Sequence, residues 1–175
     1  MTRELVDAAV LVPVFRDPVG DLRIVLIVRA EGGVHGGQIA FPGGRSDPGD
    51  ASPLDTALRE AEEEIGLTRD RVHVLDALPV LETRSTGFRI APFLARVAPP
   101  AHWTPDPREV VQVIEARALD LAAAEARGEA EMRFFGIPRP ERVRFLKIGD
   151  ARLWGVSLRI LEPLLPRLLE AGFEA

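Results

Sequence analysis

The sequence lacks cysteine, tyrosine and asparagine, and aromatic residues make up only 6% of its 175 residues. The absence of cysteine excludes disulfides, thiol catalysis and thiolate metal sites. No stretch approaches the roughly 18 apolar residues that a membrane-spanning helix needs. Residues 1–7 lack the layout of a secretory signal. We therefore expect a cytoplasmic protein without a membrane partner.

Basic residues are outnumbered by acidic ones, 22 to 27, so that the net charge is −5, and no basic run of 5–8 residues occurs. This balance argues against a nucleic-acid partner. Among the 22 basic residues, 21 are arginines and only Lys147 is a lysine. Together with 15 prolines and no asparagine, this bias indicates a heat-adapted source. The codon usage of a GC-rich genome gives the same bias, so both interpretations stay open.

Apolar residues are plentiful, at 46% of the chain. A chain of this length and content can bury a sizeable core, and we expect one domain over residues 1–175. Strands are predicted at residues 8–15, 22–28, 71–81, 88–97 and 110–115, a helix at 117–126, a hairpin from 131–135 and 142–148, and a leucine-rich helix from about 151, interrupted at Pro163. The apolar strands, buried on two faces, predict helices on both sides of a mixed sheet. The sequence leaves a homodimer open.

The most informative segment carries glutamate at four of the five positions from 60 to 64. On a helix, Glu60, Glu63 and Glu64 share one stripe about 100° wide. Carboxylates at this spacing repel one another, so a cation is expected to balance them. Oxygen ligands without an adjacent histidine or cysteine favour Mg²⁺ or Mn²⁺ over zinc. The alternative is an acidic helix face that is merely solvated.

The flanks of this segment are typical of a packed helix. Ser52 and Pro53 form a predicted N-cap and first helical position, and Gly66 is the predicted C-terminal stop. Gly43 and Gly44 would let the backbone approach an ion and present a carbonyl. An apolar stripe for packing is formed by Leu54, Leu58, Ala61 and Ile65.

Residues 59–67, REAEEEIGL, resemble the helical half of the Nudix hydrolase box, G-x5-E-x7-R-E-U-x-E-E-x-G-U, where U is aliphatic. The loop half differs: five residues separate Gly44 from Asp50, which replaces a glutamate, and eight residues instead of seven separate Asp50 from Arg59. The branch that hydrolyses coenzyme A shows a similar change in this loop. This departure is therefore the first sign of that branch.

A second resemblance to the coenzyme A branch lies upstream, in VLIVRA at residues 25–30 and HGGQIAFPGG at 35–44. The motif of that branch is L-L-T-x-R-[SA]-x3-R-x3-G-x3-F-P-G-G, and Gly33 stands where its second arginine belongs. Weaker similarity continues downstream, so that the resemblance covers roughly residues 8–170.

The resemblance implies an α/β fold, a Nudix-type α/β/α sandwich with a mixed central β-sheet. It implies metal-dependent hydrolysis of coenzyme A or acyl-CoA to 3′,5′-ADP and a phosphopantetheine. One alternative substrate is ADP-ribose or another nucleoside diphosphate derivative. A second alternative is a non-catalytic nucleotide-binding module.

Site residues follow from the same resemblance. Mg²⁺ or Mn²⁺ would be held by Glu60 and Glu64, with help from Glu63 and the Gly44 carbonyl, while Arg59 fixes a neighbouring carboxylate. The predicted proton acceptor is Glu63 or a downstream carboxylate, with candidates in the order Glu109, Glu115 and Asp106.

Substrate contacts are predicted for Arg29, His35 and Gln38 within the upstream motif. Because Gly33 replaces an arginine, the substrate phosphate needs another cation, for which the candidates are Arg45, Arg84 and Arg89. His35 has a second interpretation, as a residue that only forms hydrogen bonds within its loop. One of several aromatic residues could stack on adenine, although core packing is the more frequent role of such residues; these are Phe88, Phe93, Trp103 and Trp154.

Overall fold

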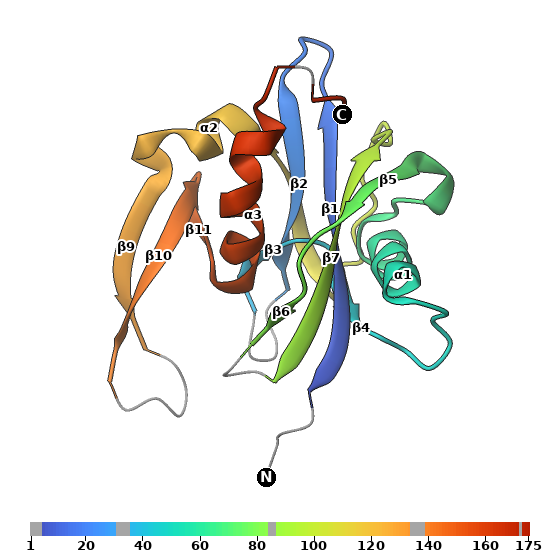
Figure 1. The fold of residues 1–175 in the computed structure, drawn as a ribbon, viewed down its shortest axis with the longest axis horizontal. Coiled ribbons are helices and arrows are strands. Elements are labelled where there is room, and N and C mark those ends of the chain that lie inside the picture. The colour runs from blue at the N-terminus through green and yellow to red at the C-terminus, as the bar shows by residue number, and fades with distance from the viewer. Residues whose placement is uncertain (1–4, 31–35, 84–86, 134–138, 172) are drawn as a thin grey trace.

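The structure is a computed structural model that describes residues 5–30, 36–83, 87–133, 139–171 and 173–175 (Figure 1). A central sheet contains β1 (Val6–Arg16), β2 (Leu22–Arg29), β3 (Ile39–Ala40), β4 (Gly43–Arg45), β5 (Val72–Ala77), β6 (Leu81–Glu82), β7 (Phe88–Val97) and β8 (Val110–Arg117). A second sheet contains β9 (Arg127–Met132), β10 (Glu141–Ile148) and β11 (Ala151–Trp154). The α-helices are α1 (Pro53–Ile65), α2 (Ala118–Ala122) and α3 (Gly155–Leu168), and single 3₁₀ turns lie at Arg69–Arg71 and Ala124–Ala126.

The central sheet is mixed, in the order β3-β2-β1-β7-β5, with β4 on β1, β6 on β7 and β8 on β2. Its two longest strands, β1 and β7, run parallel from Val6 opposite Phe88 to Val14 opposite Arg96. The other strand pairs are antiparallel. Parallel pairing requires cover on both faces, because neither face of such strands is polar.

Both faces of the central sheet are covered. Successive residues of β1 point to opposite sides, so Ala9 and Leu11 pack in one core with Ala57, Ala61 and Ile65 of α1. Val12 and Val14 pack in a second core with the leucines of α3. In Figure 1, α1 lies on one side of the sheet, and α2 and α3 lie on the other. The predicted α/β/α sandwich with a mixed sheet is confirmed.

Most predicted elements occur with changed ends. The predicted strand at 71–81 is divided into β5 and β6, and the predicted helix at 117–126 into α2 and a 3₁₀ turn. The predicted hairpin exists as β9 and β10, although β9 begins at Arg127. Its connecting residues 134–138 lie outside the described residues.

The predicted start of the last helix was wrong. Residues 151–154 form β11, which pairs with β10 from Phe145 opposite Trp154 to Ile148 opposite Ala151, and α3 begins only at Gly155. The predicted interruption at Pro163 was also wrong, because α3 continues through both Pro163 and Pro166. Proline inside a helix costs about 3 kcal/mol. Burial offsets this cost along one face of α3, through Leu158, Leu161, Leu164, Leu165 and Leu168.

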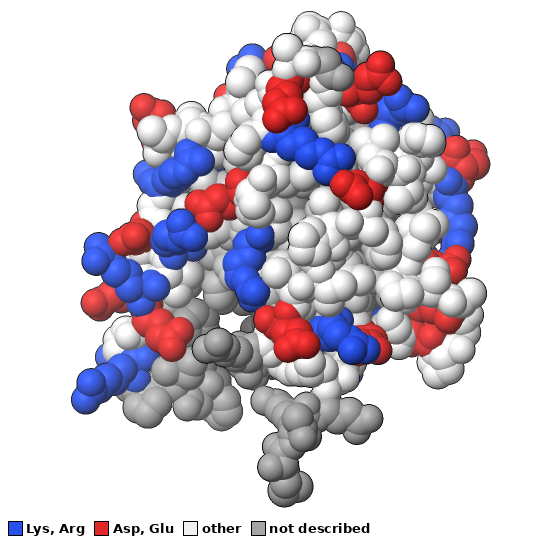
Figure 2. Space-filling model, viewed as in Figure 1, with Lys and Arg blue, Asp and Glu red and all other residues white. Residues whose placement is uncertain are grey.

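The surface carries charges of both signs. Figure 2 shows arginines interspersed with aspartates and glutamates over the face drawn. No helix among the described residues is long and apolar enough to cross a membrane.

Candidate metal centre

Helix α1 carries the acidic residues and has the predicted caps at both ends. The Ser52 hydroxyl accepts a hydrogen bond of 3.2 Å from the Asp55 N–H, and Pro53 is the first helical residue. At the other end Gly66 adopts the left-handed conformation, with φ 70°, and its N–H donates to the Glu62 carbonyl over 3.0 Å. These caps fix the length of the helix and therefore the direction of each glutamate.

Three carboxylates converge between α1 and the segment that precedes β8. One oxygen each of Glu60, Glu64 and Glu109 lies within 4.8 Å of the other two. Glu60 and Glu64 are one helical turn apart on α1, whereas Glu109 comes from the segment before β8. We call these three residues the carboxylate cluster.

The C-terminal end of α1 places Glu109. The N–H of Thr104 donates to the Ile65 carbonyl over 3.3 Å, and the N–H of Asp106 donates to the Glu64 carbonyl over 3.1 Å. From the other side, the Glu109 carbonyl accepts a hydrogen bond of 2.8 Å from the Ala30 N–H. The carbonyl groups in the last turn of α1, which have no partner within the helix, thus bind residues 104–106 and bring Glu109 to the cluster.

Glu64 is completely buried. Its Oε2 accepts a hydrogen bond of 2.8 Å from the Gly43 N–H, while Oε1 has no hydrogen-bond partner and lies 3.5 Å from Nη1 of Arg29. Burial raises the pKa of Glu64 to about 7, although the Gly43 N–H and Arg29 act in the opposite direction. A buried carboxylate oxygen without a donor is costly unless a cation balances it.

Glu60 lies directly against the double glycine. A Cβ atom on Gly44 would overlap the Glu60 carboxyl group, so only glycine leaves room for it here. Burial also raises the pKa of Glu60, although Arg59 opposes that rise. Three converging carboxylates, of which Glu64 is buried, Glu60 half-buried and Glu109 exposed, offer the oxygen ligands that suit a hard divalent cation such as Mg²⁺ or Mn²⁺.

Arg59 connects the acidic helix to the preceding loop. Its Nε and Nη2 donate to the two oxygens of Asp50 over 2.9 and 3.0 Å. Its Nη1 donates to Glu60 over 3.1 Å and to Glu63 over 3.0 Å. The Glu63 side chain is 60% exposed and lies outside the carboxylate cluster of the described residues. A ligand role for Glu63 stays a prediction.

Among the predicted substrate contacts that the structure describes, Arg29 pairs with Glu64 of the cluster over 3.5 Å. Its own N–H donates to the Gln38 carbonyl over 3.0 Å, which places Gln38 beside it. The guanidinium of Arg45 lies over the Phe88 ring, at 5.3 Å from the centroid.

Arg89 pairs with Asp7 through hydrogen bonds of 2.7 and 3.1 Å. His35 and Arg84 lie outside the described residues. The substrate roles of all six residues stay predictions.

The two other candidate proton acceptors have partners of their own. Asp106 is held by Arg108, which lowers the pKa of Asp106 to about 2. Glu115 accepts a hydrogen bond of 2.6 Å from the indole N–H of Trp103. Neither belongs to the carboxylate cluster.

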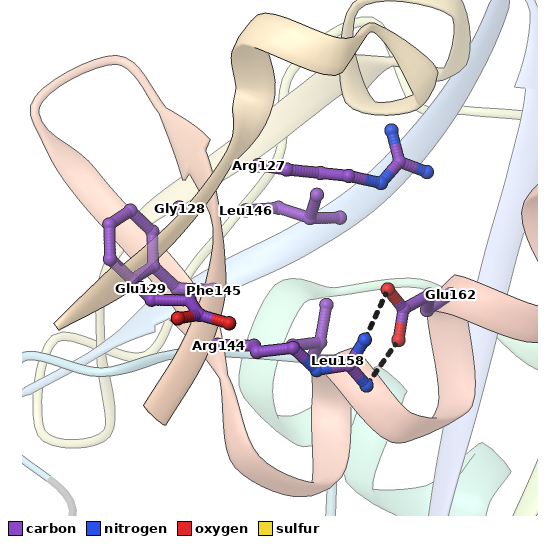
Figure 3. A pocket seen from close by; sticks show the side chains of 8 residues that line it. All are labelled: Arg127, Gly128, Glu129, Arg144, Phe145, Leu146, Leu158 and Glu162. Atoms are coloured by element: carbon purple, nitrogen blue, oxygen red, sulfur yellow. Dashed lines mark hydrogen bonds and ion pairs between the residues drawn. The ribbon is translucent and has the colours of Figure 1, made fainter. Parts of the chain in front are cut away.

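A separate groove of about 270 Å³ lies between the second sheet and α3 (Figure 3). Its charged side chains already have partners: Arg144 pairs with Glu162 over 3.0 Å, Glu129 pairs with Arg142 outside the groove over 2.6 Å, and Arg127 donates to the Ala122 carbonyl over 2.8 Å. The groove contains none of the three clustered carboxylates.

The sequence model of the NUDIX domain matches residues 5–135, which contain the double glycine, α1 and Glu109. The chain belongs to the Nudix family. Members of this family generally use divalent metal ions, and the carboxylate cluster provides suitable ligands for one. The Nudix match ends before β10, so β10, β11 and α3 lie beyond it.

Curated relatives carry the name uncharacterized Nudix hydrolase NudL. The protein from Pectobacterium atrosepticum is 40% identical over 122 residues, which are 69% of this chain and 61% of that protein. The protein from Photorhabdus laumondii is 33% identical over 162 residues, which are 90% of this chain and 82% of that protein. The chain thus spans less than two thirds of the first of these relatives.

Solved structures show the same fold. The MutT protein of Methanosarcina mazei superposes with a TM-score of 0.61 at 15% identity, and the match covers 98% of this chain and 99% of that protein. The Nudix hydrolase RenU of M. smegmatis gives a TM-score of 0.56 at 24% identity, over 69% of this chain and 74% of that chain.

Sequence reasoning missed two contributors to this Nudix site. The Gly43 N–H was not anticipated as a donor to Glu64, because a backbone contact across 21 residues leaves no trace in the local pattern. Thr56 was not singled out, although it is a completely buried polar residue on α1. The available signal was a threonine beside the apolar residues of the predicted helix, because a buried hydroxyl needs a hydrogen-bond partner.

Proposed function

We propose that this protein is a metal-dependent hydrolase of nucleoside diphosphate derivatives, with coenzyme A and acyl-CoA as its substrates. The observation that carries the proposal is the carboxylate cluster of Glu60, Glu64 and Glu109, which contains a buried oxygen without a donor. A diphosphate bears several negative charges and does not approach three carboxylates unless a cation lies between them.

The side chains divide the work as follows. Mg²⁺ would be held by Glu60, Glu64 and Glu109. When bound, the ion would neutralise the diphosphate oxygens and lower the pKa of a water molecule bound to it. Arg29, which pairs with Glu64, would contact a substrate phosphate. Glu63 is exposed next to the cluster and would accept the proton of the attacking water.

The coenzyme A assignment rests on the residues around the double glycine. The motif of the coenzyme A branch resembles this chain at Phe41–Gly44, at Asp50 and at Arg29, the last residue of β2. In the proposed reaction, water adds to one phosphorus atom and the P–O–P bridge breaks. The products are 3′,5′-ADP and phosphopantetheine, or its acyl derivative.

A substrate panel tests this assignment. Coenzyme A, acetyl-CoA and ADP-ribose are incubated separately with Mg²⁺, and the phosphate-containing products are separated by chromatography. We expect kcat/KM for coenzyme A to exceed that for ADP-ribose by at least about tenfold, which corresponds to about 1.4 kcal/mol. A preference for ADP-ribose would remove coenzyme A as the substrate.

Binding without turnover is the remaining outcome. If the protein binds these nucleotides and hydrolyses none of them, the non-catalytic module replaces the enzyme. Glu64→Gln controls for a contaminating hydrolase, because activity that persists in this variant does not come from the carboxylate cluster.

A further inference from the structure

Thr56 is a threonine whose side chain is completely buried on the first turn of α1. Its Oγ1 lies 2.8 Å from Oδ2 of Asp50 and 3.1 Å from Oγ of Ser46. A hydroxyl has one proton and a carboxylate only accepts, so Thr56 donates to Asp50. Ser46 is then the residue that can donate to Thr56.

Asp50 is the next member of the chain of contacts. Besides Thr56, it accepts a hydrogen bond of 2.9 Å from the Asp47 N–H and two hydrogen bonds from Arg59. The Arg59 guanidinium, followed by these further donors, holds the pKa of Asp50 well below its usual range. Asp50 is thus an anion held in place against the guanidinium of Arg59.

Arg59 links Asp50 to the carboxylate cluster. Its Nε and Nη2 are engaged by Asp50, which leaves Nη1 to donate to Glu60. The planar guanidinium turns as one body. Its orientation at Asp50 therefore fixes the donor that faces Glu60, and Glu60 is confined on its other side by Gly44.

The short side chain of Asp50 explains why the Thr56 hydroxyl is needed. At position 50 this chain has an aspartate, in a loop with one additional residue, where the family box has the longer glutamate. A shorter side chain has less freedom to follow the guanidinium, and its exact placement depends on donors from its own surroundings. Thr56 supplies one such donor from the helix, and the Asp47 N–H supplies one from the loop.

We propose that Thr56 is a positioning residue for metal binding, which acts through Asp50 and Arg59 to set the Glu60 carboxylate. The proposal rests on the proposed function to the extent that the carboxylate cluster holds the metal. Residues that orient metal ligands typically change metal affinity 10–100-fold when they are replaced. No contact of Thr56 with a substrate is required.

The test is a titration with Mn²⁺ alone, followed by electron paramagnetic resonance of the free ion. Thr56→Val keeps the shape of the side chain and removes the hydroxyl. We expect its Mn²⁺ dissociation constant to rise at least about tenfold. Thr56→Ser keeps the hydroxyl and should restore affinity to within about threefold of the unmodified protein.

The matched control is Thr68→Val, because Thr68 forms a side-chain hydrogen bond to Asp70, which belongs neither to the cluster nor to the contacts between Thr56 and Glu60. We expect it to leave the Mn²⁺ affinity unchanged. Thr56→Ala, which suits a helix well, serves as the second variant if Thr56→Val does not fold. Thermal unfolding of each variant confirms that the protein is folded.

Unchanged Mn²⁺ affinity in folded Thr56→Val or Thr56→Ala would overturn the proposal. So would a loss in Thr56→Ser as large as that in Thr56→Val. Failure of the metal site itself has a different signature, because Glu64→Gln would then bind Mn²⁺ as well as the unmodified protein does.

Discussion

The N–H of Gly43 donates a hydrogen bond of 2.8 Å to Oε2 of Glu64, and so joins the double glycine to a fully buried carboxylate. Gly43 has φ 151°, and a Cβ atom there would collide with the Ala9 carbonyl. Glycine is therefore needed to bring this N–H to Glu64. This hydrogen bond fixes the orientation of the Glu64 carboxylate, whose Oε1 lies 3.5 Å from Nη1 of Arg29.

The close approach of Gly44 to Glu60 gives the first prediction. Gly44→Ala would place a methyl group against the Glu60 carboxyl group and displace it. Since Gly44 does not have a positive φ, the effect on folding should be small. We expect at least about a tenfold loss of Mn²⁺ affinity, by analogy with the loss of a ligand-orienting contact, measured by calorimetry.

Gly49→Ala is the control, because Gly49 lies in the same loop, also without a positive φ, and nothing lies within 4 Å of a Cβ built there. It should bind Mn²⁺ normally. Equal affinity for the two alanine variants would show that Glu60 does not need the space beside Gly44.

The raised pKa of Glu64 gives a second prediction, on stability. In the folded protein this pKa is about 7, against 4.5 as the usual value. Between these values the folded state binds more protons than the unfolded state, so the free energy of unfolding falls as the pH rises. The contribution present at pH 4 and lost by pH 8 is about 3 kcal/mol at most.

Urea unfolding with a chelator at several pH values from about 4 to 8 measures this change. Glu64→Gln removes the titration and keeps the shape, so its free energy of unfolding should fall less over the same interval. The difference between the two pH profiles isolates Glu64, because the other groups titrate in both proteins. Parallel pH profiles of the two proteins would show that the pKa of Glu64 is not raised in the folded state.

A third prediction concerns the two-pronged contact of Arg59 with Asp50. Lysine carries the same charge, but it cannot donate to both Asp50 oxygens and to Glu60 in one plane. Arg59→Lys should therefore weaken Mn²⁺ binding by about tenfold or more. Arg69→Lys, at an exposed pair with Asp55, is the control and should bind normally. Similar affinities in both variants would mean that charge alone matters at position 59.

Local signals were sufficient to predict α1 and its caps. Ser52, Pro53 and Gly66 act within one turn of the helix ends, so the sequence alone determines their effect. The nearly unbroken apolar run of β1 likewise predicted cover on both sides of the sheet. These features depend on neighbours in the chain.

The features that the sequence did not predict depend on long-range contacts. The sequence of β11 would suit the first turn of a helix, but pairing with β10 makes it a strand. A helical wheel places Glu63 with Glu60 and Glu64, whereas the hydrogen bonds from 104–106 to α1 bring Glu109 to the cluster. Glu109 was predicted only as a proton acceptor, because its distance from α1 cannot be inferred from spacing.

Mn²⁺ binding by Glu64→Gln and Glu62→Gln, in the absence of substrate, tests whether the carboxylate cluster holds the metal ion. Both remove one charge from α1, but Glu62 is exposed and lies outside the carboxylate cluster. We expect Glu64→Gln to lose at least about 100-fold in Mn²⁺ affinity, the upper end of what residues that only orient a ligand contribute, and Glu62→Gln to bind as the unmodified protein does. Equal Mn²⁺ binding by both variants would contradict this expectation.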